Sequence, residues 1–391
     1  MEQPIILSAA RTPVGKFGGG LKNISAPKLG ALAVREAVER SDIDASTIEE
    51  CIMGNVITAG LGQNPARQAA LYGGLPPEVS ALTINKVCGS GLKAVMLASD
   101  AILAGKGRAF VAGGMENMTN APFLLEKARF GYKLFDSKLV DAMVRDGLWD
   151  VFNDFHMGNT GEIVAERHKV TREAADEFSL WSHQKAVRAS KEGAFREEIF
   201  PVEIPSKKGQ SELSSDEGPR EDTSLEALAK LKPVFRENGI LTAGNSSSIN
   251  DGAAALVVVN RETAESASVK PLARIIDYAS AGTKPELIME APIPAVKKLM
   301  DRNNLKMADI DLFEHNEAFS SASIAVMKSL EVPEDKFNVN GGAISLGHPI
   351  GCSGARVLTT LIYAMKARGA GRGIATLCLG GGNAVAMLVE R

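Results

Sequence analysis

Apolar and polar residues divide the chain into two kinds of segment, which predict strands interleaved with amphipathic helices. Residues 80–84 and 253–259 are short apolar runs typical of strands, whereas residues 92–103 repeat apolar positions at helical spacing. Residues 171–192 predict an amphipathic helix that begins after Thr171, its expected N-cap. Because strands and helices alternate, we expect an α/β fold with a mostly parallel sheet covered by helices.

The same pattern occurs twice along the chain. Residues 37–52 and 299–314 match at one spacing. Ser90 and Ser353, each followed by glycine and an apolar helix pattern, match at nearly the same spacing. Each helix then leads to a glycine turn and a strand that ends in glycines. Several matches in one order indicate an internal duplication, so we predict two α/β halves.

The region between the halves has a different character. Charge clusters and exposed turns concentrate in residues 121–245, which we interpret as an inserted loop domain. We place the N-terminal half in residues 1–120 and 246–270, and the C-terminal half in residues 271–391.

Composition narrows the classes of function. The 391 residues are 45% hydrophobic and carry a net charge of −3 without long charge runs, which argues against a nucleic-acid or polybasic membrane surface. No apolar run reaches about 18 residues and the N-terminus lacks a signal sequence, so we expect no membrane span and a cytoplasmic protein. The four cysteines lie far apart, so neither a metal site nor a disulfide framework is indicated.

Two of the cysteines stand in turns that suit chemistry. Cys88 lies between the strand predicted at 80–84 and the helix predicted at 92–103, where a helix N-terminus should lower the pKa of its thiol. The backbone amides of this glycine turn could also stabilise an oxyanion. Cys378 ends the last apolar strand and precedes three glycines, which would let a substrate approach the backbone closely. The alternative for both is a packed cysteine without a chemical role.

A histidine and an asparagine are further candidates. His348 lies in a glycine-rich loop and is followed by Pro349, and an imidazole held there could act as a base and hydrogen-bond donor. Asn316 occupies a strand-to-helix turn, where its amide could position a water or a carbonyl oxygen. The alternatives are a histidine that caps a backbone carbonyl and an asparagine that caps a helix.

Four motifs carry a resemblance to a known family. Cys88 stands in VCGSGLKAV, and the other motifs are HNEAF at 315–319, NGGAISLGHPIGCSGARVL at 340–358 and CLGGG at 378–382. In this order they resemble the thiolase family, and the resemblance covers essentially the whole chain and includes its duplication. It implies a thiolase fold of five αβαβα layers, with a loop domain over the active site.

The resemblance also implies roles for the candidate catalytic residues. Cys88 would be the nucleophile that carries the acyl group, and His348 would take its proton. Cys378 would move a proton to or from the acetyl methyl group or the thiol of coenzyme A. Asn316 would hold a water in an oxyanion hole shared with His348, and the N–H groups of Cys88 and Gly380 would form a second hole.

Coenzyme A would then be substrate and product, with no permanently bound cofactor and no metal. The substrate-binding positions that the resemblance implies are His156, Met157, Arg220, Ala243, Ser247, Ala318 and Phe319. The first two match a short-chain acyl and pantetheine pocket, and Arg220 matches a position near the adenosine end. Residues 123–140 correspond to a loop through which such enzymes form tetramers, so we expect a homo-oligomer, either a dimer or a dimer of dimers.

The implied reaction is the reversible Claisen condensation of two acetyl-CoA molecules to acetoacetyl-CoA and CoA. The alternative is a degradative 3-ketoacyl-CoA thiolase of broader chain length, which the bulk of His156 and Met157 disfavours. A non-catalytic scaffold of the same fold is disfavoured because Cys88, His348 and Cys378 are all present.

The chain departs from the family pattern at three places outside this catalytic set. His315 replaces a small residue, residues 288–292 lack the glycines of Met-Gly-x-Gly-Pro, and Ala227 stands where a serine that contacts CoA is frequent. These departures bear on acyl-chain selectivity and on CoA affinity.

Overall fold

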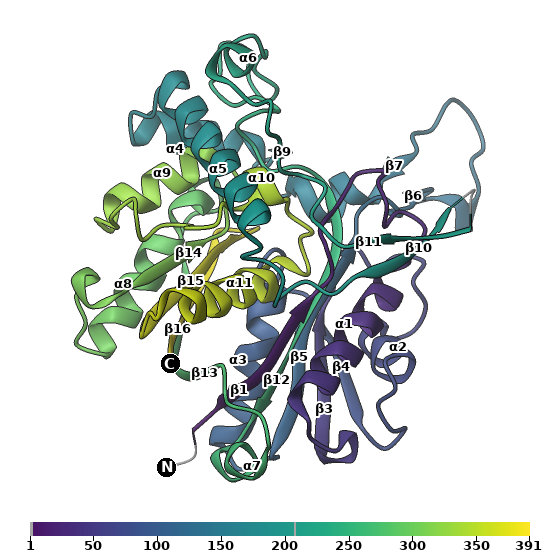
Figure 1. Cartoon of the computed structure of the whole chain (residues 1–391). Helices are drawn as coiled ribbons and strands as arrows, with labels where there is room; N and C mark the ends of the chain where they lie inside the picture. Colours follow the sequence, from purple (N-terminus) through teal and green to yellow (C-terminus); the bar gives the residue numbers. More distant parts are fainter. Residues whose placement is uncertain (1–2, 207–208) are drawn as a thin grey trace.

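The computed structural model describes residues 3–206 and 209–391, and a ten-stranded sheet forms its centre (Figure 1). The strands of this sheet are β1 (Ile5–Arg11), β2 (Gly15–Lys16), β3 (Ile48–Gly54), β4 (Ser80–Ile84), β5 (Ala109–Asn117), β12 (Asn250–Val259), β13 (Ala273–Gly282), β14 (Leu312–His315), β15 (Arg372–Leu379) and β16 (Asn383–Glu390). They lie in the order β14-β15-β16-β13-β1-β12-β5-β3-β4, and β2 pairs with β12 beside this path.

Helices cover the sheet and also occur in the inserted region. The α-helices are α1 (Ala26–Ser41), α2 (Pro65–Tyr72), α3 (Ser90–Leu103), α4 (Gly158–Arg167), α5 (Arg172–Glu192), α6 (Leu225–Ala229), α7 (Arg261–Ser266), α8 (Pro292–Arg302), α9 (Ser320–Ser329), α10 (Ala343–Leu346) and α11 (Ser353–Arg368). Short helical turns are η1 (Ala45–Thr47), η2 (Ala128–Phe130), η3 (Met143–Leu148), η4 (Pro285–Glu290) and η5 (Met307–Asp309). The hairpins outside the main sheet are β6 (Phe123–Leu124) with β7 (Val140–Asp141), β8 (Trp149–Asp150) with β9 (Phe155–His156), and β10 (Val202–Ser206) with β11 (Gly209–Leu213).

Local sequence signals placed several of these elements correctly. β4 has the predicted bounds, β12 begins three residues before its predicted start, and α3 begins two residues before its own. Thr171 caps α5 as expected, since its side chain accepts a hydrogen bond from the N–H of Ala174 at 3.2 Å.

The duplication is visible in the strand order. In the N-terminal half the order is β4-β3-β5-β12-β1, and in the C-terminal half it is β14-β15-β16-β13, with Phe337 bridged in parallel to Phe313 of β14 in the place that β4 occupies. A short antiparallel pairing, of Ile5 with Arg274 and Ile6 with Ala273, joins the two halves. The two halves therefore repeat one αβ unit, as the sequence predicts.

The sheet is mixed, so the expectation of a mostly parallel sheet is wrong. β3 pairs in parallel with β4 and β5, and β14 with β15, whereas β12 and β16 pair antiparallel with both of their neighbours. The turn after β15 is only three residues long, which restricts β16 to an antiparallel course. In that turn Gly381 and Gly382 both have a φ of 80°, where glycine is favoured. Cys378 therefore does not end the last strand, because β16 follows it.

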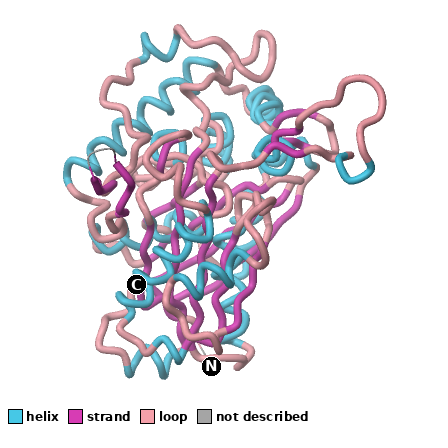
Figure 2. Tube along the Cα trace, turned by 90° about the vertical axis from the view of Figure 1, so that its right-hand side faces the viewer, coloured by secondary structure: helices cyan, strands magenta, loops and turns pink. Residues whose placement is uncertain are grey.

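The layers follow from which helices pack on which face. Helices α3 and α11 pack against each other between the two halves of the sheet, while α1 and α2 cover the N-terminal half and α8 covers the C-terminal half (Figure 1). This is the five-layer αβαβα arrangement. The loop between β6 and β7, which carries η2, stands away from the rest of the chain (Figure 2). No helix in residues 3–206 and 209–391 is both long and apolar enough to cross a membrane.

Two glycines permit the close approach of α3 and α11. A Cβ atom on Gly91 would lie 2.6 Å from the backbone nitrogen of Ala355, and one on Gly354 would lie 2.3 Å from the backbone nitrogen of Leu92. Neither space can hold a methyl group, so the sequence Ser-Gly at the start of each helix is a packing requirement. The contact brings together the turn that contains Cys88 and the loop that contains His348.

We expect Gly354→Ala to lower the free energy of unfolding by about 1–3 kcal/mol, because the added methyl group overpacks the helix contact. Gly371→Ala is the matched control, since a Cβ atom there would meet only a carboxylate oxygen of Asp311 at 3.5 Å. Urea denaturation of both variants measures the difference. Equal stability of the two variants would contradict the role given to Gly354.

Candidate active site

Cys88 sits in a strained turn between β4 and α3. Val87, directly before it, has a φ of 48°, a left-handed conformation that is rare for a β-branched residue and costs of order 1–3 kcal/mol. Ser90 holds the turn: its hydroxyl accepts from the N–H of Lys86 at 2.8 Å and donates to the carbonyl of Val87 at 2.6 Å. The turn therefore presents Cys88 in a defined position at the start of α3.

Burial, not the helix N-terminus, dominates the pKa of Cys88. Desolvation raises the pKa of this thiol to about 12, although the backbone N–H groups of Cys88 and Gly380 point at the sulfur and favour the thiolate. The expectation of a lowered pKa is therefore wrong for the resting protein. The two N–H groups are nevertheless the pair that the family resemblance implies as an oxyanion hole, and both lie at the sulfur.

The turn after β15 lies against the Cys88 turn. A Cβ atom on Gly89 would lie 1.8 Å from Cδ2 of Leu379, so only glycine permits this approach. It brings Cys378 close to Cys88, and the proximity of the two thiols adds to burial in raising the pKa of Cys378. Cys378 is 2% exposed, whereas Cys88 is only partly buried.

His348 is oriented by contacts on two sides. Its backbone N–H donates to Oδ1 of Asn250 at 2.9 Å, and its Nδ1 lies 2.6 Å from Oγ of Ser353. The hydroxyl of Ser353 donates to the carbonyl of Pro349 at 2.8 Å, so its oxygen accepts a hydrogen bond from Nδ1–H of His348. This tautomer leaves Nε2 free to accept a proton. Burial lowers the pKa of His348 to about 3, so the imidazole is neutral at rest.

Asn316 contacts the His348 ring. Its Nδ2 lies 3.4 Å from both ring nitrogens, and its backbone N–H donates to the carbonyl of Thr376 in β15 at 3.1 Å. Its side-chain oxygen, Oδ1, is buried and has no hydrogen-bond partner among the described residues. A buried acceptor without a partner fits the expected role of holding a water.

The candidate acyl pocket is an apolar cluster around Cys378. Met157, Ala318 and Phe319 belong to one buried cluster with Cys378, together with Met289. His156 extends this wall through Phe235: the two rings stack with their centroids 4.9 Å apart, and Phe235 packs edge-on against Phe319 at 5.6 Å. The structure thus brings these four predicted binding residues to the side of Cys378.

The other predicted binding positions lie further from the thiols. Ser247 is held beside the pocket, since its N–H donates to the carbonyl of Ala318 at 3.0 Å, and the neighbouring Ala243 is exposed. Arg220 borders a separate surface cavity of about 450 Å³ along α5. His183 also lines this cavity and accepts from the N–H of Arg220 at 3.2 Å.

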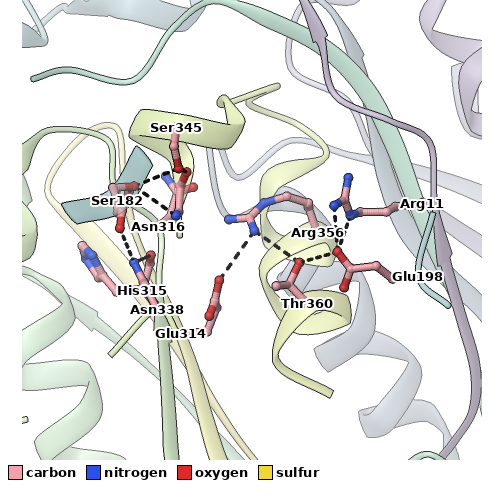
Figure 3. Close-up of polar contacts among 12 residues, drawn as sticks. Arg11, Ser182, Glu198, Glu314, His315, Asn316, Asn338, Ser345, Arg356 and Thr360 are labelled. Carbon is pink, nitrogen blue, oxygen red and sulfur yellow. Dashed lines mark hydrogen bonds and ion pairs between the residues drawn. The ribbon is translucent and has the colours of Figure 1, made fainter. Parts of the chain in front are cut away.

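A buried polar network lies behind the site (Figure 3). Arg11 pairs with Glu198, which accepts from Thr360 at 3.2 Å, and Arg356 lies 3.6 Å from Glu314 at the end of β14. The turn that carries Asn316 is held in the same region, where Glu317 accepts from Ser182 at 2.7 Å. These contacts tie β1, α5, α11 and the Asn316 turn together.

Sequence reasoning missed the residues that hold the catalytic loops. Glu116 accepts from the N–H groups of Val56, Ile57 and Gly351 and from Asn55, and burial raises its pKa to about 7. It therefore joins the loop after His348 to β5 and to the segment after β3. In the sequence Ser353 marks only the duplication, and the signal for its contact with the imidazole is its spacing of five residues from His348.

Within the described part of the chain, no group of three or more histidine, cysteine or carboxylate side chains could hold a metal ion. The four cysteines are free thiols.

Comparison with known proteins identifies the family to which this chain is similar. The family model for the thiolase N-terminal domain matches residues 4–262, and that for the C-terminal domain matches residues 269–391. The chain is 51% identical to acetyl-CoA acetyltransferases of Cupriavidus necator and Escherichia coli, and each match covers all of both proteins. A crystal structure of the Bacillus anthracis acetyl-CoA acetyltransferase superposes with a TM-score of 0.98 at 40% identity, over 100% of this chain and 99% of that one.

We expect Ser353→Ala to slow the alkylation of Cys88 by iodoacetamide at pH 7 by about tenfold, because the tautomer that leaves Nε2 as an acceptor is no longer favoured. This is far less than the about 10⁴-fold loss that follows when a carboxylate partner of histidine is replaced in a serine protease. Mass spectrometry of the Cys88 peptide over time gives the rate. Ser353→Thr keeps the hydroxyl and should restore most of it, and an unchanged rate in the alanine variant would refute the tautomer assignment.

A second prediction concerns His315, which is fully buried and whose pKa burial lowers to about 3. Below pH 6.5 the unfolded chain takes up a proton there that the folded chain does not, so this residue makes the protein less stable as pH falls. We expect His315→Gln to reduce the pH dependence of the unfolding free energy by about 1.4 kcal/mol per pH unit between about pH 4 and pH 6. Denaturation curves at several pH values measure this slope, and identical slopes in both proteins would show that His315 is protonated in the fold.

Proposed function

The chain belongs to the thiolase family, and from this premise we propose that it condenses two acetyl-CoA molecules reversibly to acetoacetyl-CoA and CoA through an acetyl group carried on Cys88. The observation that carries this proposal is that the thiols of Cys88 and Cys378 lie close together, and that the N–H groups of Cys88 and Gly380 point at the sulfur of Cys88. Cys88 can carry the acyl group while Cys378 transfers the proton at C2 of the second substrate. The protein is accordingly an acyltransferase with acetyl-CoA acetyltransferase activity.

The first half of the reaction loads Cys88. His348 takes the thiol proton on Nε2 as the sulfur attacks the thioester carbonyl of acetyl-CoA. The developing oxyanion accepts hydrogen bonds from the N–H groups of Cys88 and Gly380, a contribution worth about 3–4 kcal/mol per donor in studied enzymes. The intermediate collapses to acetyl-Cys88, and the departing CoA thiolate takes the proton of Cys378.

The second half forms the carbon–carbon bond. Cys378, now a thiolate, takes a proton from C2 of a second acetyl-CoA, and its raised pKa makes it a strong base for this step. The enolate oxygen is held by protonated His348 and by a water on Asn316. C2 then attacks acetyl-Cys88, acetoacetyl-CoA forms, and the Cys88 thiolate recovers its proton from His348.

The pocket supports an acyl group of two carbons. Met157 and Phe319 close the apolar cluster at Cys378, and the stacked His156 and Phe235 extend the wall. Long 3-ketoacyl chains would have to displace these packed side chains. A narrow range of chain length therefore follows better than a degradative thiolase of broad range.

We place coenzyme A along the inserted region. Ser247 lies beside Ala318 at the pocket, and pantetheine would pass along these two residues. The cavity along α5 is lined by Arg188, Lys191 and Arg220 and also by Glu192 and Glu221. Lys191 is paired with Glu221 at 2.9 Å, and the guanidinium groups of Arg188 and Arg220 can face the phosphates. CoA acts here as substrate and product.

We also propose that the chain works as a homo-oligomer in the cytoplasm, without nucleic-acid or membrane partners. β4 lies at the open edge of the sheet, where a second copy can pair. The loop between β6 and β7 exposes large apolar side chains, among them Phe130 at 84% and Phe135 at 91%, which a further interface between copies would cover. A dimer at β4 and a tetramer through the loop fit these features.

The test is CoA-dependent thiolysis of acetoacetyl-CoA beside 3-ketooctanoyl-CoA. We expect strong cleavage of the first and weak cleavage of the second, and a loss of at least about 10³-fold in Cys88→Ala because the nucleophile is gone. Cys51→Ala is the matched control, since Cys51 is buried in β3 away from the site. Equal cleavage of the longer substrate would favour the degradative enzyme, and no cleavage of either would refute the assignment.

A further inference from the structure

Ser182 is a buried side chain beside the Asn316 turn that no step of the proposed reaction uses. It lies in α5 of the inserted region and is fully buried. Its hydroxyl donates to Oε2 of Glu317 at 2.7 Å. Its oxygen accepts from the N–H of Gly342 at 3.3 Å and lies 2.9 Å from Oγ of Ser345 (Figure 3). One hydroxyl of the inserted region therefore contacts two segments of the C-terminal half.

These two segments lead to two groups that the proposed reaction places at the enolate oxygen. Glu317 directly follows Asn316 in the chain, and helix α10 ends two residues before His348. Ile344 of α10 donates its N–H to Oε2 of Glu317 at 3.2 Å. The carboxylate of Glu317 thus joins the Asn316 turn to the segment before His348, and Ser182 binds it from the inserted region.

The carboxylate of Glu317 depends on a few neutral donors. It is fully buried, and Asn338 donates to its Oε1 at 2.8 Å. Burial raises the pKa of this carboxyl group, and the hydrogen bonds from Asn338 and Ser182 counteract that rise. Loss of the Ser182 hydroxyl would leave Oε2 with the N–H of Ile344 at 3.2 Å, so the buried carboxylate would gain by moving toward other donors.

A movement of Glu317 would affect Asn316 more than His348. The side-chain amide of Asn316 reaches the imidazole nitrogens only at 3.4 Å, so its position depends on the turn that carries it. His348 is held independently, by Asn250 at 2.9 Å and by Ser353 at 2.6 Å. We therefore expect the imidazole to stay in place when the Asn316 turn shifts.

We propose that Ser182 is a positioning residue for the enolate step and acts through Glu317 on Asn316. The inference rests on the proposed function, because that function holds the enolate oxygen with protonated His348 and a water on Asn316. Transfer of the acetyl group between CoA and Cys88 uses the backbone N–H groups at the sulfur instead. Loss of the Ser182 hydroxyl should therefore slow formation of the carbon–carbon bond more than it slows acetyl transfer.

The test measures both steps in one preparation of Ser182→Ala. The initial rate of acetoacetyl-CoA formation from acetyl-CoA reports the carbon–carbon bond, and the exchange of isotopically labelled CoA into acetyl-CoA reports acetyl transfer. The ratio of the two rates is independent of how much protein is active. We expect this ratio to fall about tenfold, because even a displacement of about 1 Å in a reacting geometry costs about 10²-fold.

Ser179→Ala is the matched control. Ser179 is fully buried in the same helix, and its hydroxyl donates to the carbonyl of Ala175 one turn earlier, at 2.7 Å. The substitution thus removes a buried hydroxyl from α5 without touching Glu317. This variant should keep the wild-type ratio, and Ser182→Thr, which retains the hydroxyl, should restore most of it.

An unchanged ratio in Ser182→Ala would overturn the proposal, as would an equal fall in Ser179→Ala or in Ser182→Thr. If the alanine variant does not fold, Ser182→Cys replaces it, and its weaker thiol donor should lower the ratio in the same direction. A wild-type ratio in the cysteine variant would then count against the proposal. Failure of the wild type to form acetoacetyl-CoA would instead refute the proposed function.

Discussion

The contact between the starts of α3 and α11 is the constraint on which the site depends. Gly91 and Gly354 let the two helix backbones approach so closely that a methyl group fits on neither side. Each helix is preceded by a loop with a reactive side chain, Cys88 in one half and His348 in the other. The duplication therefore supplies two equivalent turns, and the helix contact makes them neighbours.

A serine at the first position of α3 and of α11 makes the same contact in both halves, with a different effect in each. Ser90 and Ser353 stand at the first position of their helices, and each donates to a carbonyl in the preceding turn. In the N-terminal half the serine oxygen accepts a backbone N–H and shapes the turn of Cys88. In the C-terminal half it lies against the His348 ring and selects its tautomer. The same hydrogen bond from a serine at the helix start thus positions the nucleophile Cys88 in one half and the base His348 in the other.

Burial sets the electrostatic character of the site. It raises the pKa of both thiols and lowers that of His348, so the resting groups are neutral although the helix start favours a thiolate. Charge develops only when the sulfur of Cys88 attacks the thioester carbonyl, whose oxygen becomes an oxyanion at the N–H groups of Cys88 and Gly380. In such surroundings donors that are already in place are worth more than in water, because no solvent has to reorganise.

Sequence alone determined the αβ pattern, the duplication, the positions of Cys88, His348 and Asn316 in turns and that of Cys378 near the end of a strand, because helix starts, apolar periods and glycine turns are local signals. It did not determine the strand directions, the sign of the pKa shift at Cys88, or the role of Glu116. Those depend on segments far apart in the chain: β12 returns after the inserted region, and Glu116 accepts a hydrogen bond from Gly351 of the other half. Burial and proximity of this kind are properties of the packed fold, and only the tertiary structure decides them.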